Sequence, residues 1–520
     1  MQERPPLVEA LLRPQTYGGG VDRVELVETH ISWVFLAGDR AYKVKKPVDL
    51  GFLDFTTLER RRRFCEEELR LNRRLAPELY LAVIPITGTP QAPRLGGEGT
   101  PIEYALVMRR FDQEALLDRL LARGALAPAE LEQAAADIAR FHARAAVADP
   151  ASRFGRPETV HAPVRDNFAH MRRLSQAAAV RQRLDRLEAW AEDAYARLAP
   201  VMEARRRDGR VRECHGDIHL GNMARVDGRV RVFDAIEFND DFRWIDTASD
   251  LAFPVMDLHD RGRPDLATVF LDAYLEAGGD WEALRLLRYY MAYRANVRAK
   301  VTLIRAAQAP AEAAALEERA VAYLDLADAL ARGRRPALVL CCGPSGAGKS
   351  HWARRLAPAL GAVRVRSDVE RKRLFGLAPT ERAAAAPGEG IYTPEASRRT
   401  YARLAEIAAM GLEARFPVVV DAAALSRAQR AGLREVAAAA GCPFVILAFH
   451  APPEVLRSRV ARRARSGHDA SDADLEVLAA QLRTLEPPHA DEADRVIDLD
   501  GHRAVDVAAL AAAVEELTRG

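Results

Sequence analysis

The chain has 520 residues, of which 49% are hydrophobic and 29% are charged, and its formal net charge is +2. This length exceeds what one hydrophobic core normally serves, so we expect two or three domains. The near balance of charge gives no global argument for binding nucleic acid or an anionic membrane. Residues 1–14 lack the long apolar stretch of a signal peptide, and no apolar run approaches the length of a membrane span. We therefore expect a cytoplasmic protein without a membrane partner.

The cysteines and lysines indicate the compartment of the protein and its candidate functional residues. Five cysteines, an odd number without CxxC spacing, argue against a disulfide framework and indicate small core residues in a reducing compartment. Only six lysines occur among the 76 basic residues, at positions 43, 45, 46, 300, 349 and 372. Lysine is not used here as general surface charge, so each one is a candidate for a role that needs a point charge on a flexible stem.

The first predicted elements are three short strands, residues 21–28, 33–37 and 41–45, the last two flanking a Gly-Asp-Arg turn signal. Because strand side chains alternate, Lys43 and Lys45 share one face. Ala-x-Lys is the pattern of the kinase strand whose lysine pairs with ATP phosphates and with a helical glutamate. Lys43 is the candidate for this role and Lys45 the alternative. A solvated strand face is the less favoured interpretation, because a catalytic loop downstream would need such a lysine.

A strongly charged helix is predicted over residues 57–75, with apolar residues at helical spacing on the face that also carries Glu68. Glu68 is the candidate partner of the lysine and Glu67 the second choice, against an ordinary surface pair with one of the neighbouring arginines. Residues 103–109 form an apolar strand where a bilobal kinase would meet adenine through its backbone, and Met108 is the candidate wall of that site.

Helices dominate the middle of the chain. Residues 130–147 form an Ala-rich helix in which His142 is interpreted as a packed residue and not as a catalyst. Residues 164–208 are helical and Arg-rich, and residues 262–331 indicate several further helices.

The segment His215-Gly216-Asp217-x-x-x-x-Asn222 presents a carboxylate and, five residues on, an amide. A second carboxylate, Asp234, follows the next apolar run. Phosphoryl transfer from ATP needs one group to orient the attacking hydroxyl and two to hold Mg²⁺ on the phosphates. The kinase catalytic loop is written H-R-D-x-x-x-x-N, so this spacing predicts an ATP-dependent transferase.

These residues resemble the aminoglycoside phosphotransferase family, the small-molecule branch of the protein-kinase-like fold. The resemblance implies that Asp217 is the catalytic base and that Asn222 and Asp234 are the Mg²⁺ ligands. It also implies a buried polar brace beneath the loop, built around Asp246 and Asp250. Helix capping and first-turn charge are the interpretation favoured here for these last two residues.

A second nucleotide site is predicted after the Arg- and Gly-containing linker 331–336. The apolar strand 337–342 leads into G-x-x-x-x-G-K-S, whose backbone N–H groups and helix N-terminus would cradle phosphates. Lys349 would reach the terminal phosphates and Ser350 would bind Mg²⁺. The full set of predicted phosphate-loop residues is Gly343, Pro344, Ser345, Gly346, Ala347, Gly348, Lys349 and Ser350.

Three further features belong to this second site. The strand 418–421 ends in Asp421, a candidate Mg²⁺ carboxylate, with a turn residue as the alternative. Asp368 follows another strand and resembles the acceptor-binding Asp of small P-loop kinases of the gluconate-kinase and zeta-toxin kind. Arg459 and Arg463 lie one turn apart on a later helix, where such kinases carry a lid over the phosphates. A solvated arginine face is the alternative.

The chain as a whole resembles a bacterial group that fuses a kinase-like half to a P-loop half. The expected fold is α/β and α+β multidomain: a kinase-like N-lobe (1–110), a kinase-like C-lobe (111–333) and a P-loop domain with a parallel sheet (334–520). The expected function is phosphorylation of small-molecule hydroxyls at two sites, with ATP and Mg²⁺ and without nucleic acid. Two alternatives remain: a ligand-sensing N-terminal half, or a P-loop half acting on a nucleotide or nucleic-acid end.

Overall fold

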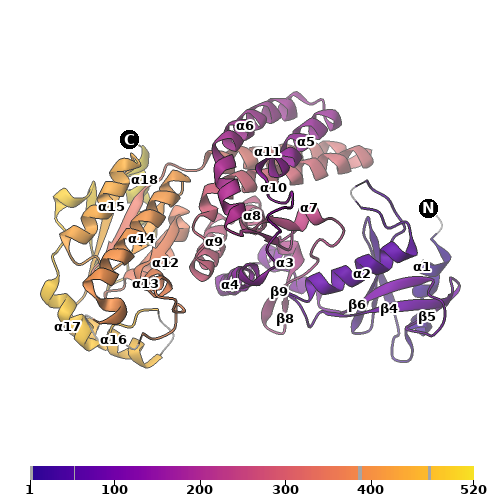
Figure 1. The fold of residues 1–520 in the computed structure, drawn as a ribbon, viewed down its shortest axis with the longest axis horizontal. Coiled ribbons are helices and arrows are strands. Elements are labelled where there is room, and N and C mark those ends of the chain that lie inside the picture. The colour runs from indigo at the N-terminus through magenta and orange to yellow at the C-terminus, as the bar shows by residue number, and fades with distance from the viewer. Residues whose placement is uncertain (1–3, 52, 384–388, 467–469, 520) are drawn as a thin grey trace. The chain divides into compact units, whose positions relative to one another are not determined.

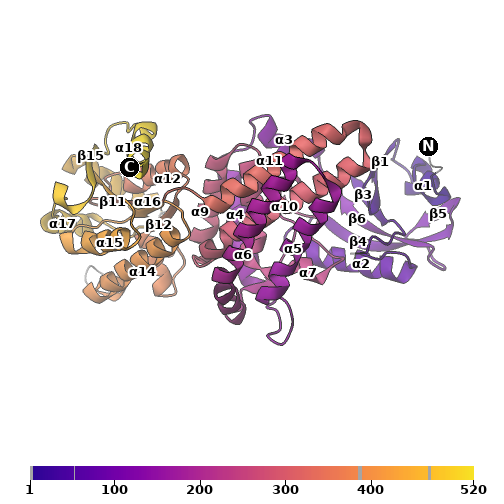
Figure 2. The same cartoon turned by 90° about the horizontal axis from the view of Figure 1, so that it is seen from above.

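A computed structural model of the protein describes residues 4–51, 53–383, 389–466 and 470–519. The chain divides into two compact units, Met1–Val160 with Glu203–Pro254 and His161–Met202 with Val255–Gly520. Figures 1 and 2 show the elements of each unit. Within the described ranges, no helix is both long enough and apolar enough to cross a bilayer.

The first unit begins with a six-stranded antiparallel sheet in the order β1-β2-β3-β6-β4-β5. Its strands are β1 (Val24–Glu28), β2 (Ser32–Ala37), β3 (Arg40–Lys45), β4 (Tyr80–Thr89), β5 (Ala92–Leu95) and β6 (Glu103–Arg109). Alternation places Phe35 and Val44 in a core that also receives Val8 of helix α1 (Pro6–Leu11). Helix α2 (Leu58–Asn72) starts where the Thr57 side chain accepts a hydrogen bond from the Arg60 N–H.

The remainder of the first unit carries the catalytic-loop sequence between short elements. These are α3 (Leu117–Ala122), α4 (Pro128–Arg144), β7 (Val211–Glu213), β8 (Met223–Val226), β9 (Arg229–Val232), α7 (Asp240–Arg243) and β10 (Trp244–Asp246). β8 and β9 form an antiparallel hairpin, and β7 pairs with β10. The predicted loop therefore connects β7, which pairs with β10, to β8, which pairs with β9. The hairpin of β8 and β9 leads directly to Asp234.

Three long helices contain a boundary between the units: α5 (Pro157–Leu174), α6 (Ala178–Arg207) and α8 (Thr247–Asp260). The second unit continues with α9 (Pro264–Gly278), α10 (Ala283–Gln308) and α11 (Ala313–Arg332). The helical segment expected over 164–208 is thus two helices, and α9, α10 and α11 account for the helices expected over 262–331.

The second unit also contains a five-stranded parallel sheet in the order β12-β13-β11-β14-β15. Its elements are β11 (Leu338–Cys342), α12 (Lys349–Leu360), β12 (Val363–Arg366), α13 (Ser367–Leu374), α14 (Pro394–Glu413), β13 (Val418–Asp421), α15 (Arg427–Ala439), β14 (Phe444–His450), α16 (Pro453–Ser466), α17 (Leu475–Thr484), β15 (Arg495–Asp500) and α18 (Val507–Arg519). The inner strands are continuous apolar runs, as expected where helices cover both faces. The expected combination of an antiparallel sheet in the first half and a parallel sheet after the P-loop motif is present.

Candidate active sites

The catalytic-loop sequence follows β7 and is fixed from beneath by one buried carboxylate. The N–H groups of His215 and Gly216 each donate to Asp250, at 2.9 Å, and His142 Nε2 lies 3.1 Å from the same carboxylate. Gly216 has φ +91°, and a Cβ there would lie 2.6 Å from the Phe242 carbonyl oxygen, so the turn requires glycine. Burial disfavours the Asp250 charge, but these donors outweigh it and lower its pKa to about 2.

Asp250 lies in the first turn of α8, as the capping and first-turn interpretation expected, and these contacts show that it also braces the loop. Asp246 does accept the Ala248 N–H at 2.8 Å in the first turn of that helix, as the capping interpretation expected, and it also pairs with the buried Arg205 at 2.7 Å. The interpretation of His142 as a packed helix residue agrees with its burial, and its contact makes it part of the brace.

The predicted base and metal ligands lie around this loop. Asn222 Nδ2 donates to the backbone oxygen of Asp217 at 3.0 Å and to its carboxylate at 3.2 Å, which leaves the amide oxygen to face a cation. Asp234 adopts φ +63°, and its N–H donates to the Tyr80 hydroxyl at 3.0 Å. Carboxylate and amide oxygens are the ligands that Mg²⁺ prefers, so Asn222 and Asp234 fit that ion.

Both strand lysines of β3 meet the same helical glutamate. Glu68 holds Lys43 through one carboxylate oxygen and Lys45 through the other, each at 2.7 Å. Lys43 also contacts Asp234 at 2.8 Å, while Lys45 pairs with Glu237. Burial opposes the charge of Lys43, but Asp234 and Glu68 outweigh it and hold its pKa well above the usual value.

The two lysines differ in exposure, which separates their roles. The Lys45 side chain is fully buried and enclosed by two carboxylates, so it has no open path to a nucleotide. Lys43 is 11% exposed and touches the half-exposed Asp234. Of the two open alternatives, Lys43 is therefore the one that adjoins the predicted metal ligand.

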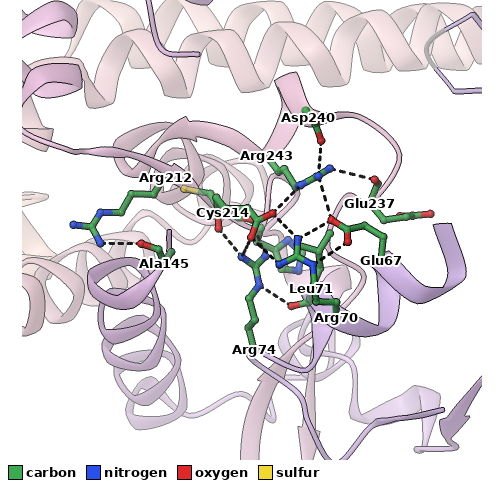
Figure 3. A network of polar contacts seen from close by, with 12 residues as sticks. Glu67, Arg70, Leu71, Arg74, Ala145, Arg212, Cys214, Glu237, Asp240 and Arg243 are labelled. Carbon is green, nitrogen blue, oxygen red and sulfur yellow. Dashed lines mark hydrogen bonds and ion pairs between the residues drawn. The ribbon is translucent and has the colours of Figure 1, made fainter. Parts of the chain in front are cut away.

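Glu67 belongs to a different network, drawn in Figure 3. It pairs with Arg70 at 2.6 Å and with Arg243 at 3.2 Å. Arg74, just beyond the end of α2, donates to the backbone oxygen of Cys214 at 3.0 Å, where the predicted catalytic loop begins. This network ties α2 to the loop and leaves Glu68, of the two glutamates, for the lysines.

Met108 lies on β6, the neighbour of β3, and its backbone is in register with Ala41. Its side chain packs with Phe111 and Phe233 against a small buried cluster. Phe233 directly precedes Asp234. Met108 is thus part of an apolar wall beside the lysine strand, in keeping with a surface on which a base could rest.

In the second unit the predicted P-loop joins β11 to α12, as the motif requires. Lys349 Nζ donates to the Pro344 carbonyl at 2.9 Å, and Gln481 accepts from the Ser345 N–H at 2.8 Å. The loop lies under a close backbone crossing, because a Cβ on Gly501 would come within 1.8 Å of the Ala347 oxygen. Burial lowers the pKa of Lys349.

A cavity of about 430 Å³ opens over this loop. Its lining includes Lys349, Ser350, Arg366, Asp368, Asp421 and Arg463. One oxygen of Asp421 is buried and has no hydrogen-bond partner in the described part of the chain. Asp421 and Ser350 line the same cavity, and carboxylate and hydroxyl oxygens suit a hydrated Mg²⁺, so the residues present fit this ion.

The two lid arginines lie differently. Arg463 lines the cavity over Lys349, whereas Arg459 donates to the backbone oxygens of Gly346 and Gly501, at 3.1 and 3.0 Å. Arg459 and Arg463 both line a second hollow, which also includes Lys349, Ser350 and Trp352. Both arginines therefore adjoin the P-loop, and Arg463 also lines the first cavity.

Sequence reasoning missed several residues of these sites. Glu237 and the second role of Lys45 had no local motif to signal them. The same is true of Tyr392, whose hydroxyl donates to Asp472 at 2.8 Å, and of the buried Lys372, which pairs with that carboxylate at 3.0 Å. The rarity of lysine was the one available signal, since both Lys45 and Lys372 are fully buried and paired.

Comparison with known proteins agrees with both halves. Residues 39–287 match the model of the phosphotransferase enzyme family, and residues 338–488 match that of the AAA domain. Similar solved structures include a gluconokinase from Sinorhizobium meliloti 1021, 29% identical over 36% of this chain and 94% of that one, with a TM-score of 0.25. A choline/ethanolamine kinase family protein from Mesorhizobium loti is 15% identical over 63% of this chain and 99% of that one, with a TM-score of 0.38.

The protein is therefore a kinase-type phosphotransferase, a class that takes ATP as phosphoryl donor and generally needs Mg²⁺. The relatives extend over both halves. The chain is 31% identical to Rv2004c of Mycobacterium tuberculosis and to Mb2027c of Mycobacterium bovis, each over 466 residues that cover 90% of this chain and 91% of the relative. It belongs to the family of these two-part mycobacterial proteins.

Proposed function

We propose that the protein phosphorylates small-molecule hydroxyls at two separate MgATP sites, one in each half. The observation that carries this proposal is that each half holds a full set of the groups phosphoryl transfer needs. The first set is Lys43, Glu68, Asp217, Asn222 and Asp234, and the second is Lys349, Ser350, Asp368 and Asp421.

In the first half, Asp217 would accept the proton of the acceptor hydroxyl. The new O–P bond forms as the bond from the γ-phosphorus to the bridging oxygen breaks, and ADP leaves. Lys43, held by Glu68, would meet the phosphates when Asp234 turns to its cation. Mg²⁺ bound by Asn222 and Asp234 would neutralise the charge on the phosphates.

In the second half, the backbone N–H groups of the P-loop would bind the phosphates. Lys349 would stabilise the charge of the phosphoryl group during its transfer. Its lowered pKa reflects burial, which strengthens its interaction with an incoming anion. Asp368, on the wall of the same cavity, is the group that would orient the acceptor hydroxyl. Catalysis at both sites would rest on positioning and charge stabilisation, without a covalent protein intermediate.

The test measures ATP consumption against pooled sugars, polyols, nucleosides and aminoglycosides. Wild type, Asp217→Ala and Lys349→Ala are compared side by side. We expect each substitution to abolish the response to one pool and spare the other. If no pool stimulates turnover beyond a basal rate that depends on Lys349 alone, the first half is a binding module and the proposal for it is rejected.

A further inference from the structure

Part of the wall of the P-loop cavity is held by a helix from outside residues 334–520. The wall in question is the end of β12 and the start of α13, which carry Arg366 and Asp368. The helix is α9, which lies within the range that matches the phosphotransferase family. Both belong to the second compact unit.

Two acidic residues one turn apart on α9 bind Arg364 of β12. Asp272 accepts from the Arg364 backbone N–H at 3.2 Å and from its Nε at 2.9 Å, and Glu276 accepts from Arg364 Nη2 at 3.0 Å. The Arg364 side chain is only 9% exposed. Arg364 does not line the cavity, so its pairs attach β12 to α9 without touching the site.

The end of α9 continues this attachment onto α13. Trp281, buried just beyond the helix, donates from its indole nitrogen to Glu370 at 3.2 Å. Gly279, in the left-handed conformation that ends α9, lies against the guanidinium of Arg373. The first turn of α13, with Asp368, therefore rests on a fixed support.

Glu276 differs from Asp272 because its second carboxylate oxygen contacts Arg366, a residue that lines the cavity. Oε1 accepts from Arg366 Nη1 at 3.2 Å, while Arg366 Nε lies 3.7 Å from Oδ2 of Asp421, the buried oxygen that accepts no hydrogen bond. The guanidinium is thus shared between a carboxylate outside the cavity and the predicted Mg²⁺ carboxylate within it. Arginine and a carboxylate readily form a two-bond pair, so loss of one carboxylate partner favours contact with the other.

We propose that Glu276 is a positioning residue of the P-loop site: by holding Arg366, it keeps Asp421 open to Mg²⁺. The inference rests on the proposed MgATP site in this half and extends it to helix α9. Without the Glu276 carboxylate, Arg366 would close onto Asp421 as a full ion pair and compete with the cation.

The test uses the full chain and reads nucleotide affinity, not only turnover. ADP is titrated calorimetrically with Mg²⁺ and again with EDTA, counting only the binding that Lys349→Ala removes. The Mg²⁺ gain is the factor by which Mg²⁺ raises the affinity for ADP over the affinity in EDTA. Glu276→Gln should leave the affinity in EDTA within about twofold and reduce the Mg²⁺ gain by about fivefold. This is a modest value for coupling between contacting charged groups. Phosphate release from MgATP should need correspondingly more Mg²⁺.

A double variant makes the test specific, because the two explanations predict opposite directions for its Mg²⁺ gain. In Glu276→Gln/Arg366→Gln the competing guanidinium is gone, so the Mg²⁺ gain should return toward the wild-type value. A loss of support alone would instead make the double variant no better than the single one. If Glu276→Gln is too unstable to study, Glu276→Asp, which keeps the charge but shortens the reach, should shift the gain in the same direction.

The matched control is Asp272→Asn, one turn away on the same helix. It removes a partner of Arg364 and leaves the contact between Glu276 and Arg366 in place, so it should lower stability and keep the Mg²⁺ gain. An equal loss of the gain in Asp272→Asn, or no change in Glu276→Gln, overturns the inference. If wild type shows no ADP binding that Lys349→Ala removes, the proposed P-loop site itself fails and the inference with it.

Discussion

Two lysines on one strand face the same glutamate, yet their surroundings assign them different tasks. Lys43 lies between Glu68 and the half-exposed Asp234, where phosphates and a cation can replace its partners. Lys45 lies between Glu68 and Glu237 with no exposed surface, so nothing can replace it. Removing one member of a fully buried ion pair typically costs about 3–5 kcal/mol, because the partner charge is left uncompensated.

Lys43→Met and Lys45→Met should therefore fail in different ways. We expect Lys43→Met to reduce the turnover that depends on Asp217 by on the order of a hundredfold or more, with little change in the urea midpoint. Lys45→Met should instead lower the unfolding free energy by several kcal/mol, and Lys45→Met/Glu237→Gln should recover part of that loss. Equal turnover and equal stability in the two single variants would contradict this division.

A histidine on α8 predicts a pH dependence of stability. Burial, with the nearby charges of Arg288 and Arg334, lowers the pKa of His259 from 6.5 to about 4. The unfolded chain therefore takes up a proton near pH 6.5 that the folded chain refuses until about pH 4. The contribution to stability is present above pH 6.5 and is lost as the pH falls toward 4.

Between pH 7.5 and 5.0 this single group should cost the wild type about 2 kcal/mol of unfolding free energy. His259→Gln has no such proton to bind, so its stability should fall by about 2 kcal/mol less over the same interval. Urea unfolding of both proteins at the two pH values measures the difference. Parallel losses in wild type and variant would show that His259 stays protonated on folding.

At the scale of elements, the catalytic loop depends on a brace from α8. Asp250 accepts two backbone N–H groups and the ring of His142, and all of these groups are buried. Asp250→Asn keeps the shape but presents an amide donor to groups that are themselves donors. We expect it to cost about 2 kcal/mol or more in stability and to reduce turnover that depends on Asp217, while activity that depends on Lys349 is spared.

The control for this prediction is Asp260→Asn, at the far end of the same helix, where the aspartate pairs with a half-exposed arginine. That substitution should change stability by less than Asp250→Asn does, because its arginine partner is half-exposed. Measuring both turnovers in the two variants separates loss of the brace from general damage to α8. Full activity in a stable Asp250→Asn protein would mean that the loop does not need the brace.

Local motifs made these elements readable in the sequence. The P-loop, the predicted catalytic loop and the lysine strand each combine a short pattern with a strand or turn that the pattern requires, so Lys349, Asp217 and Lys43 could be named as candidates. Glu237 could not, because its partner Lys45 is nearly two hundred residues away and nothing local marks either charge. Glu276 was hidden for the same reason: a surface-like acidic residue on a helix becomes part of a site only through tertiary contact.

On the scale of the whole molecule, each half has its own buried cluster and its own proposed nucleotide site. The P-loop sheet is packed around Val339, Cys341 and Leu447, while the N-terminal sheet packs around Phe35 and Val44. Ligands that bind a folded unit stabilise it by an amount that grows with the logarithm of ligand concentration, about 2.7 kcal/mol at a hundredfold excess over the dissociation constant. Nucleotide binding at the two sites should therefore stabilise two separate folded units against unfolding.

Calorimetric unfolding with and without MgADP tests this expectation on the intact protein. For units of this size, such a free energy corresponds to a shift of about 5 °C or more in the transition. MgADP should shift two transitions in wild type; Lys349→Ala should abolish one shift and Asp234→Ala the other, each leaving the second intact. If Lys349→Ala folds normally and yet removes both shifts, nucleotide binding is confined to the P-loop half, and phosphoryl transfer in the first half would have to be abandoned.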